Sequence, residues 1–343
     1  MTLKEIAAEA GVSISTVSRV INQKNTKAAS KDVQDRIWEI VRRTNYIPNS
    51  MARNLKLGKD AAYEDIEPKS IACIFARTDN AISDPFFSQL AKSIEQESFR
   101  NNYFVKYSFS AIDINNPRTS KSISDIQVDG VVILGRYDKQ LLKFFTSHYQ
   151  NVVYTGLNPG GDKYDQVVCD GYEAAMTAIT YLTKLGHKNI GYIGEQTNEI
   201  RFSAYKDALS KQGLTFKQAN AANVKLSSEG GYTGANILLD RNTDITAIFC
   251  ANDKTAIGAM HALKERNLRI PSDISIISID DIDTAQYLSP MLTTVHIPVE
   301  DLGKMTAKIL IDRICGGHKL PMKTVLPFYI VKRESCGKLN LSR

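Results

Sequence analysis

The sequence predicts an all-α helix-turn-helix headpiece followed by an α/β domain of two lobes, each a parallel sheet covered by helices. Three observations support this prediction. Short amphipathic helices meet at a glycine near the N-terminus, basic residues gather in the same segment, and strands alternate with helices over the rest of the chain. With 343 residues, 43% of them hydrophobic, the chain can bury more than one core.

The N-terminal helices follow from capping and spacing. Thr2-Leu3-Lys4-Glu5 fits a capping box, and apolar residues then recur at helical spacing until Gly11 ends the helix. Ser13 can cap a second helix from Ile14 to Asn22. Two short helices joined by a tight glycine turn form a helix-turn-helix. A third helix, Lys31 to Thr44, has enough apolar surface to close a three-helix core.

The basic residues are concentrated in this headpiece. Residues 1 to 60 hold eleven Lys and Arg against six Asp and Glu, so nearly all of the net charge of +6 lies there. A small basic module ahead of a near-neutral body is expected where one end of a protein meets a polyanion. A short helix is predicted between Pro48 and Lys56, and the polar stretch that follows is typical of a linker. We therefore divide the chain into a headpiece at 1-48, a hinge helix and linker at 49-69, and the two-lobed domain at 70-337.

The two-lobed domain is predicted from alternating strands and helices. The elements of the first lobe are strands at 71–76, 104–109, 130–134 and 152–155, and a helix at 85–101. The pattern restarts after Asp170 with strands at 189–193, 247–250 and 274–279, and with helices ending at Leu185 and beginning near Arg201 and Asp253. Such alternation indicates parallel sheets, and two lobes side by side create a cleft at the carboxyl ends of their strands, where ligands bind.

Several function classes are disfavoured. The cysteines are odd in number, scattered and never in a C-x-x-C pair, which argues against a disulfide framework or a zinc site; they are Cys73, Cys169, Cys250, Cys315 and Cys336. We expect them to be reduced and mostly buried. No stretch approaches the roughly 18 apolar residues of a membrane span, and the chain begins with a charged amphipathic segment rather than a signal peptide. We therefore expect a cytoplasmic protein that does not contact a membrane.

Enzyme chemistry finds little support. There is no P-loop, no G-x-S-x-G and no H-E-x-x-H, and the five histidines are isolated in the sequence. The run Asp280-Asp281-Ile282-Asp283 could be a pair of catalytic carboxylates or a cation site. Because it follows a predicted strand, we favour one ligand contact flanked by solvated acidic neighbours. We expect no catalytic residues, no cofactor and no metal.

A series of short motifs runs from Thr2 to about Cys336. They are Ile6-Ala7, Ala10-Gly11-Val12-Ser13, Thr16-Val17-Ser18-Arg19-Val20-Ile21-Asn22, Tyr46-Ile47-Pro48-Asn49, Ala52-Arg53, Leu55, Asp84-Pro85-Phe86-Phe87, Val128-Asp129-Gly130-Val131, Leu185-Gly186-His187-Lys188-Asn189-Ile190-Gly191-Tyr192-Ile193-Gly194, Ala251-Asn252-Asp253, Ser289-Pro290-Met291-Leu292-Thr293-Thr294-Val295 and Val331-Lys332-Arg333-Glu334-Ser335-Cys336. In this order they resemble the lactose-repressor family of bacterial transcriptional regulators.

The resemblance implies a periplasmic-binding-protein-like domain in which the chain crosses between lobes three times. We place the first lobe at about 70-169 and 294-325 and the second at about 170-293 and 326-337. The resemblance also implies a homodimer whose two headpieces each contact half of a near-palindromic operator DNA. Too few residues follow Cys336 for the leucine-heptad tail that makes some relatives tetramers.

The resemblance also places residues that contact DNA. The base-contacting positions of the second helix fall on Ile14, Ser15 and Arg19, of which Arg19 can donate a fork to guanine O6 and N7. Phosphate contacts are expected from Thr16, Ser18 and Asn22. In the hinge, Leu55 matches a leucine that wedges into the minor groove, with Ala52 and Arg53 beside it. The alternative for Leu55 is packing against the next lobe.

Effector contacts are implied for Phe86, Thr197, Arg201, Asn252 and Asp280. An Asp, an Asn and an Arg can bond vicinal hydroxyls while an aromatic ring lies against a sugar's C–H face, so this set suits a sugar. Each could instead be structural, because Asn252 can cap the following helix and Arg201 can pair with Asp207.

Three departures from the family pattern bear on the effector. Thr155 stands where relatives often have an Asp, Leu226 stands where some have an aromatic wall, and the loop Gln23 to Ala29 is about two residues longer than in close relatives. From the motifs and the implied effector contacts, we expect a transcriptional repressor of a carbohydrate-utilisation operon, controlled by a small molecule, with a sugar as the favoured effector. The alternatives are a regulator that responds to a nucleoside, a purine or a phosphocarrier protein, and a solute-binding protein of a transport system.

Overall fold

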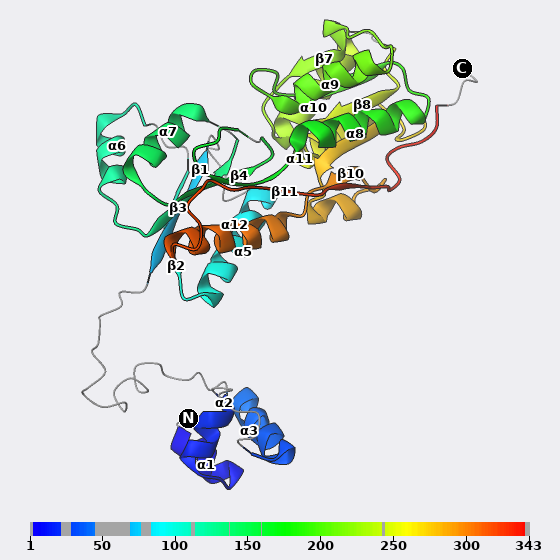
Figure 1. Ribbon diagram of the computed structural model, residues 1–343. Helices are drawn as coiled ribbons and strands as arrows, with labels where there is room; N and C mark the ends of the chain where they lie inside the picture. The colour runs from blue at the N-terminus through cyan, green and yellow to red at the C-terminus, as the bar shows by residue number, and fades with distance from the viewer. Residues whose placement is uncertain are drawn as a thin grey trace. The chain divides into compact units, whose positions relative to one another are not determined.

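The chain forms two compact units in the computed structural model, one within Met1–Ile66 and one within Glu67–Arg343 (Figure 1). The structure describes residues 3–21, 29–44, 69–76, 84–110, 114–136, 138–158, 160–241 and 244–339. The predicted hinge helix lies outside these residues, as does the predicted linker except for Lys69.

The first unit is a three-helix headpiece made of α1 (Leu3–Ala10), α2 (Ile14–Ile21) and α3 (Lys31–Arg43). One fully buried residue from each helix, Ile6, Val17 and Ile37, lies in the shared core. Gly11 joins the first two helices with a φ of +67°, a backbone conformation that favours glycine. The predicted helix-turn-helix and third helix are therefore confirmed.

The first lobe of the second unit is a six-stranded sheet, in which all pairings are parallel. Its strands are β1 (Ser70–Ala76), β2 (Phe104–Ser110), β3 (Gly130–Gly135), β4 (Val152–Gly156), β5 (Asp165–Cys169) and β11 (Lys323–Leu326), in the spatial order β11-β5-β4-β3-β1-β2. Its helices are α5 (Pro85–Arg100), α6 (Pro117–Ser124), α7 (Lys139–His148) and α12 (Val299–Ile314).

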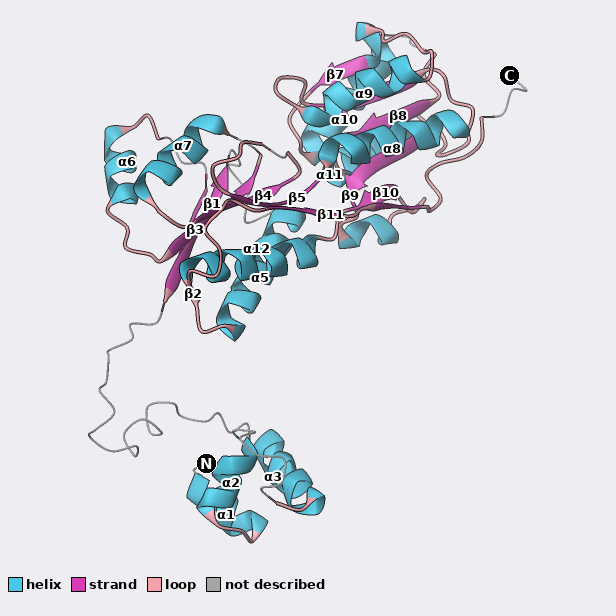
Figure 2. Ribbon diagram, in the orientation of Figure 1, coloured by secondary structure: helices cyan, strands magenta, loops and turns pink. Residues whose placement is uncertain are grey.

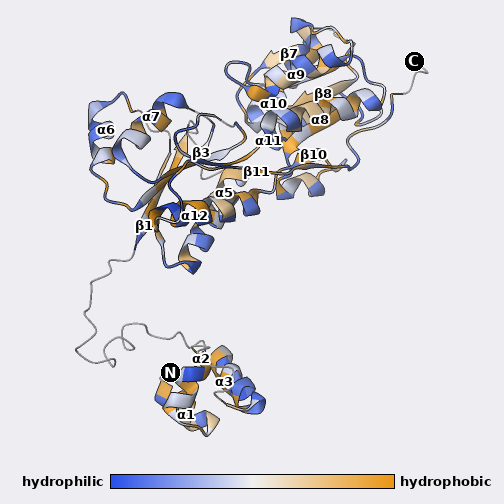
Figure 3. Cartoon of the chain, in the orientation of Figure 1, coloured by the Kyte–Doolittle hydropathy of each residue, from blue (hydrophilic) through white to orange (hydrophobic). Residues whose placement is uncertain are grey.

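Helices cover both faces of this sheet (Figure 2), and alternate side chains of β1 are buried on opposite faces. Ile71, Cys73 and Phe75 are buried in one core with residues of α5 and α12. Ala72 and Ile74 are buried in another, with residues of α6 and α7. Successive side chains of a strand point to opposite faces, so a strand covered on both sides is apolar throughout, as the hydrophobic colouring of β1 shows (Figure 3).

The second lobe repeats this plan with a mixed sheet. Its strands are β6 (Ile190–Gly194), β7 (Ala221–Asn223), β8 (Ala247–Cys250), β9 (Ser275–Asp280), β10 (Thr293–His296) and β12 (Tyr329–Val331), in the order β12-β10-β9-β8-β6-β7. Only β12 pairs antiparallel among these strands. Its helices are α8 (Gly171–Lys184), α9 (Ile200–Lys211), α10 (Ser228–Asp240) and α11 (Asp253–Glu265), with short 3₁₀ helices η2 (Gln218–Asn220) and η3 (Asp283–Tyr287).

The chain passes between the two sheets three times, and two predicted boundaries need correction. Leu326, which we assigned to the second lobe, belongs to the first, because it pairs with Cys169 of β5. The passages follow β5, β10 and β11. Residues 294 to 296, which we assigned to the first lobe, belong to the second, because Thr294, Val295 and His296 pair with β9 and with β12. The second passage thus follows β10 instead of cutting through it.

Two expectations about the chain's chemistry can also be compared with the structure. All five cysteines are free thiols, and three of them, Cys73, Cys169 and Cys250, are buried, as predicted. Among the residues that the structure describes, no helix combines the length and the apolar character needed to cross a membrane.

Helices α10 and α11 cross closely enough that glycine is required at the contact. A Cβ added to Gly258 would lie 1.8 Å from the carbonyl oxygen of Ser228 and 2.7 Å from the backbone nitrogen of Tyr232. We expect Gly258→Ala to lower the free energy of unfolding by about 1–3 kcal/mol, because the helices must separate. Urea unfolding followed by far-UV circular dichroism measures this change. Lys264→Ala, at an exposed position of the same helix, should stay within about 0.5 kcal/mol of the parent; an equal loss in both variants would contradict the steric explanation.

Candidate effector site and DNA-contacting face

A cavity of 460 Å³ lies between the lobes, at the carboxyl ends of strands from both sheets. Both lobes contribute to its lining. The lining residues are Ala76, Asp84, Phe86, Phe87, Gly135, Arg136, Gly156, Leu157, Asn158, Glu195, Glu199, Arg201, Lys225, Leu226, Ser227, Glu229, Asn252, Lys254 and Asp280. Four of the five predicted effector contacts, Phe86, Arg201, Asn252 and Asp280, are therefore brought together. The fifth, Thr197, is exposed and does not line the cavity.

Arg201 is held rigidly at the start of α9. Its Nε and Nη2 atoms donate to the two carboxylate oxygens of Glu199 at 2.7 and 3.0 Å, and Nη1 donates to the carbonyl oxygen of Ala251 at 2.7 Å. Glu199 is the N-cap of the same helix and also accepts from the Arg201 backbone nitrogen. The alternative pairing with Asp207 does not occur, because Asp207 accepts from the Tyr172 hydroxyl. Arg201 keeps further N–H groups available for a ligand, since a guanidinium carries five.

Asp280 ends β9 with a φ of +127° and is only 9% exposed. Its carboxylate makes no hydrogen bond to any residue that the structure describes. Burial, followed by the nearby charge of Asp253, raises the pKa of Asp280 well above its ordinary value. By contrast, Asp253 accepts from Ser278, Thr294 and the Ile282 backbone, so its role is structural. A buried carboxyl group without a partner is costly, and this makes Asp280 the group most in need of a ligand.

Phe86 and Asn252 each stand at a helix start. Asp84 caps α5 and thereby fixes Phe86, whose ring packs edge-on against Phe87. Asn252 caps α11, its side-chain oxygen accepting from the Thr255 backbone and hydroxyl, as the structural alternative predicted. Its amide nitrogen makes no bond to another described residue, so one residue can both cap the helix and donate to a ligand.

The run 280–283 differs from the prediction at one position. Asp281 is not a solvated neighbour, because its carboxylate pairs with Arg333 at 2.7 Å and with His296 at 2.9 Å. These partners come from β10 and from the segment after β12, which sequence spacing does not reveal. Asp283 is exposed, as expected. Within the described part of the chain, no group of three or more His, Cys, Asp and Glu side chains is placed to hold a metal ion.

Three ion pairs cross the cavity from lobe to lobe, and we did not predict any of them from the sequence. Arg136, directly after β3, reaches Glu195 and Glu199 of the second lobe. Lys254 of α11 lies 3.4 Å from Asp84 of the first lobe. No local sequence pattern predicts these ion pairs, because the two partners of each pair lie more than fifty residues apart in the chain. The two departures noted above lie differently: Leu226 lines the cavity, whereas Thr155 is fully buried outside it.

The headpiece presents a polar face along α2. Ser15 and Arg19 are exposed, and Ile14 is 39% exposed. The Ser13 hydroxyl accepts from the Thr16 backbone at 3.2 Å and thereby starts the helix. Thr16 and Ser18 are half-buried. The other predicted DNA contacts, Asn22, Ala52, Arg53 and Leu55, lie outside the described residues.

A helix-turn-helix headpiece and a two-lobed domain with a polar interlobe cavity together define the class of ligand-responsive DNA-binding regulators. Residues 2–49 match the model for bacterial regulatory proteins of the lacI family, and residues 179–336 match the periplasmic binding protein-like domain. The chain belongs to the lacI family and is a bacterial transcriptional repressor.

Individual relatives span nearly the whole chain. The chain is 31% identical to the HTH-type transcriptional repressor PurR of Photorhabdus laumondii, over 97% of this chain and 96% of that protein. It is 30% identical to the HTH-type transcriptional repressor MelR of Bacillus subtilis, over 98% and 97%. A solved structure of a lacI-family regulator from Enterococcus faecium with bound ribose has a TM-score of 0.69 and 27% identity, over 79% of this chain and 100% of that one.

Proposed function

We propose that this protein represses a carbohydrate-utilisation operon and that a neutral sugar, bound between the lobes, controls it. The observation that carries this proposal is the buried Asp280 carboxyl group, which lacks a hydrogen-bond partner among the described residues and lies with Phe86 and Asn252 around one cavity. Sugar hydroxyls can both donate to and accept from a carboxyl group, and an aromatic ring covers their C–H face.

The charges around the cavity favour a neutral ligand over a phosphorylated one. Arg136, Arg201 and Lys254 are each paired with a carboxylate, and the remaining cation of the lining, Lys225, is exposed. A phosphate would therefore have to displace a carboxylate or approach the unpaired Asp280. The ribose bound to the Enterococcus faecium relative supports the same class of ligand.

We further propose a homodimer that binds a near-palindromic operator through α2, with release from DNA when the sugar binds. A two-fold protein matches a two-fold site. A coupling of about 1–3 kcal/mol between the sites would change operator affinity by about 5- to 150-fold. We expect no catalytic activity and no cofactor. The transport alternative shares only the two-lobed domain, and the headpiece at 2–49 favours a regulator.

The experiment that tests this function titrates the full chain onto DNA from around its own gene, at two salt concentrations, with sugars, sugar phosphates and nucleosides added singly. We expect tight, salt-sensitive binding to a near-palindrome that a neutral sugar weakens. A response to a nucleoside or a sugar phosphate instead would reject the neutral-sugar effector and leave the repressor in place. Binding that is indifferent to DNA sequence would reject operator recognition.

Arg19 should carry much of the operator specificity. Arg19→Ala is expected to weaken specific binding by about 5- to 150-fold, equivalent to 1–3 kcal/mol, because a bidentate contact to guanine is lost. Arg19→Lys is the informative comparison, since it keeps the charge but not the fork. Electrophoretic mobility shifts on the operator and on a single-base variant measure both effects. If Arg19→Lys kept full discrimination between the two DNAs, Arg19 would be a phosphate contact only.

A further inference from the structure

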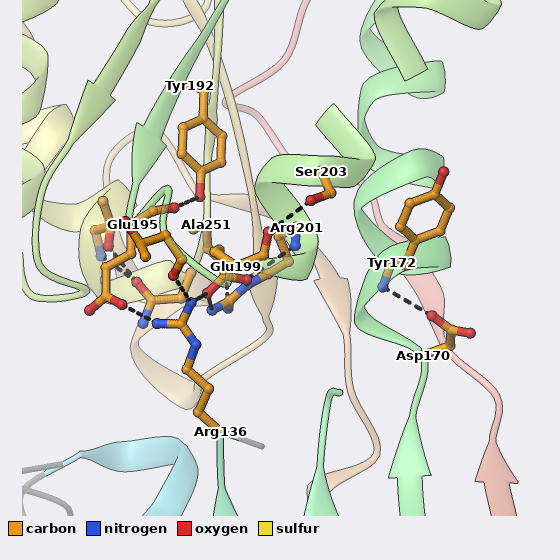
Figure 4. Close-up of polar contacts among 12 residues, drawn as sticks. Arg136, Asp170, Tyr172, Tyr192, Glu195, Glu199, Arg201, Ser203 and Ala251 are labelled. Carbon is orange, nitrogen blue, oxygen red and sulfur yellow. Dashed lines mark hydrogen bonds and ion pairs between the residues drawn. The ribbon is translucent and has the colours of Figure 1, made fainter. Parts of the chain in front are cut away.

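Arg136 lies in the first lobe, yet its hydrogen-bond and ion-pair partners among the described residues all lie in the second. It follows β3, and its guanidinium contacts the Glu195 carboxylate, the Thr197 carbonyl oxygen at 2.7 Å and the Glu199 carboxylate at 3.4 Å. Figure 4 shows the side chain extending from its strand to a point between the two glutamates. The side chain is 14% exposed, so these contacts are made in a largely water-excluded site.

These contacts hold one loop of the second lobe, residues 195–199, which connects β6 to α9. The loop is fixed from its own lobe as well, because the Tyr192 hydroxyl donates to the Glu195 carbonyl oxygen and Glu199 caps α9. Arg136 is thus the first-lobe residue that fastens a rigid loop at the edge of the cavity.

The same contacts connect Arg136 to the ligand-facing residues. Glu199 lies between two arginines, with Arg136 on one side and Arg201 on the other, and Arg201 in turn bonds the Ala251 carbonyl oxygen. Ala251 directly precedes Asn252, which lines the cavity. A movement of Arg136 relative to the second lobe therefore changes the surroundings of Glu199 and Arg201.

One donor of Arg136 is still unused. Its Nε atom is buried and has no hydrogen-bond partner among the described residues, although the other two nitrogens are bonded. Arg136 also lines the cavity. A buried N–H group of a cation is almost always satisfied, and a hydroxyl oxygen of a sugar bound in the cavity becomes an acceptor for it when the guanidinium turns toward the cavity.

We propose that Arg136 is both the latch that closes the first lobe onto loop 195–199 and a ligand-orienting residue, whose Nε–H donates to a hydroxyl oxygen of the bound sugar. The second part rests on the proposed function, because it requires a polyhydroxyl ligand in the cavity. The first part does not, because the latch contacts are made by the protein alone. Arg136 would then be a specificity-determining residue beyond the four cavity-lining contacts that the sequence predicted.

Lobe closure can be measured on the full chain without knowing the effector. Cys315, exposed at the end of α12, offers a native label site in the first lobe, and Ser210→Cys adds an exposed one on α9 in the second. Pulsed electron-spin distance measurements between the two labels report closure. We expect Arg136→Gln to lengthen and broaden the distance distribution of the ligand-free protein. Glu195→Gln, which removes a carboxylate partner of Arg136 in the second lobe, should lengthen and broaden it as well.

Two further variants separate a latch from general stability. Arg266→Gln removes an ion pair with Asp240 inside the second lobe and should leave the distance unchanged. Arg136→Lys should preserve closure, because it keeps a positive charge next to the Glu195 and Glu199 carboxylates. It lacks, however, the Nε–H group of the planar fork. If both Arg136→Gln and Glu195→Gln left the distance distribution as in the parent, the latch would be refuted. Should Arg136→Gln not fold, Glu195→Gln decides the question.

Ligand orientation is tested by calorimetric titration with D-ribose and a panel of other neutral sugars. Arg136→Lys, closed but lacking the Nε–H, should bind the sugar at least 10-fold more weakly than the parent. Parent-like affinity in that variant would overturn the ligand-orienting role. If the parent protein bound no sugar at all, the neutral-sugar effector and the ligand-orienting role would fall together, whereas the spin-label distances would still decide the latch.

Discussion

Asp280→Asn is expected to make the protein more stable and the sugar bind about 10- to 150-fold more weakly. The carboxyl group is buried at 9% exposure without a hydrogen-bond partner among the described residues, so the ligand-free protein bears the cost of desolvating it. An amide is neutral and removes this cost, which should raise the free energy of unfolding by about 1 kcal/mol or more near neutral pH. The same change removes a charged acceptor that a sugar hydroxyl needs, and such bonds contribute about 1.5–3 kcal/mol.

The change in stability caused by Asp280→Asn should depend on pH. Because the pKa of Asp280 is higher in the folded than in the unfolded chain, its contribution to stability is complete below about pH 4 and is lost as the pH rises through the raised pKa. Asp253, whose pKa burial raises to about 6, acts in the same direction. The stability gained by Asp280→Asn should therefore be small at pH 4 and grow as the pH rises.

Thermal unfolding at several pH values measures the change in stability, and calorimetric titration with the sugar measures the change in affinity. Asp280 already holds a φ of +127°, and Asn has nearly the same size and shape as Asp, so the substitution should add no new backbone strain. Asp283→Asn, three residues further on at an exposed position, is the matched control and should change neither stability nor affinity appreciably. Loss of stability in Asp280→Asn would show that Asp280 has a structural role instead.

The fold was predictable wherever the local pattern is strong. The predicted bounds of the strand β1 and of the helix α5 differ from the observed ones by one residue, because an unbroken apolar run and an Asp-Pro helix start are local signals. Strands β5, β7, β10, β11 and β12 were not predicted. Three of them, β7, β11 and β12, are sheet edges, and β11 alternates between exposed and half-buried residues because it has a neighbour on one side only.

The residues of the candidate site were likewise predictable only where their position follows from a local motif. Motif matching found residues that stand at strand ends and helix starts, such as Phe86 and Asn252, because the fold alone places these positions at the cavity. It assigned Thr197 a ligand contact, yet the loop instead offers its carbonyl oxygen to Arg136. It could not find Arg136 or Glu199, since their importance arises from a pairing across two lobes. Spacing in the sequence contains no information on how far a cleft is closed.

Glu199→Ala is expected to destabilise the two-lobed domain by about 3–5 kcal/mol. Glu199 is buried and accepts from the Arg201 side chain and backbone, and it also pairs with Arg136. Removing it leaves two guanidinium groups in a largely water-excluded site with one less carboxylate between them, and breaking a buried pair from one side is strongly destabilising. The arginines lower the pKa of Glu199 despite its burial, so it is ionised at neutral pH and its charge is what the alanine variant loses.

The measurement is urea unfolding of the domain by far-UV circular dichroism, with fluorescence of Trp38 reporting the headpiece separately, because Trp38 is the single tryptophan and lies in α3. The headpiece transition should not move. Asp240→Ala removes the carboxylate of an exposed pair with Arg266 in the same lobe and should cost less than about 1 kcal/mol. If both alanine variants lost the same small amount, water would be reaching the Glu199 cluster, and the lobes of the free protein would be open enough to solvate Arg136 and Arg201.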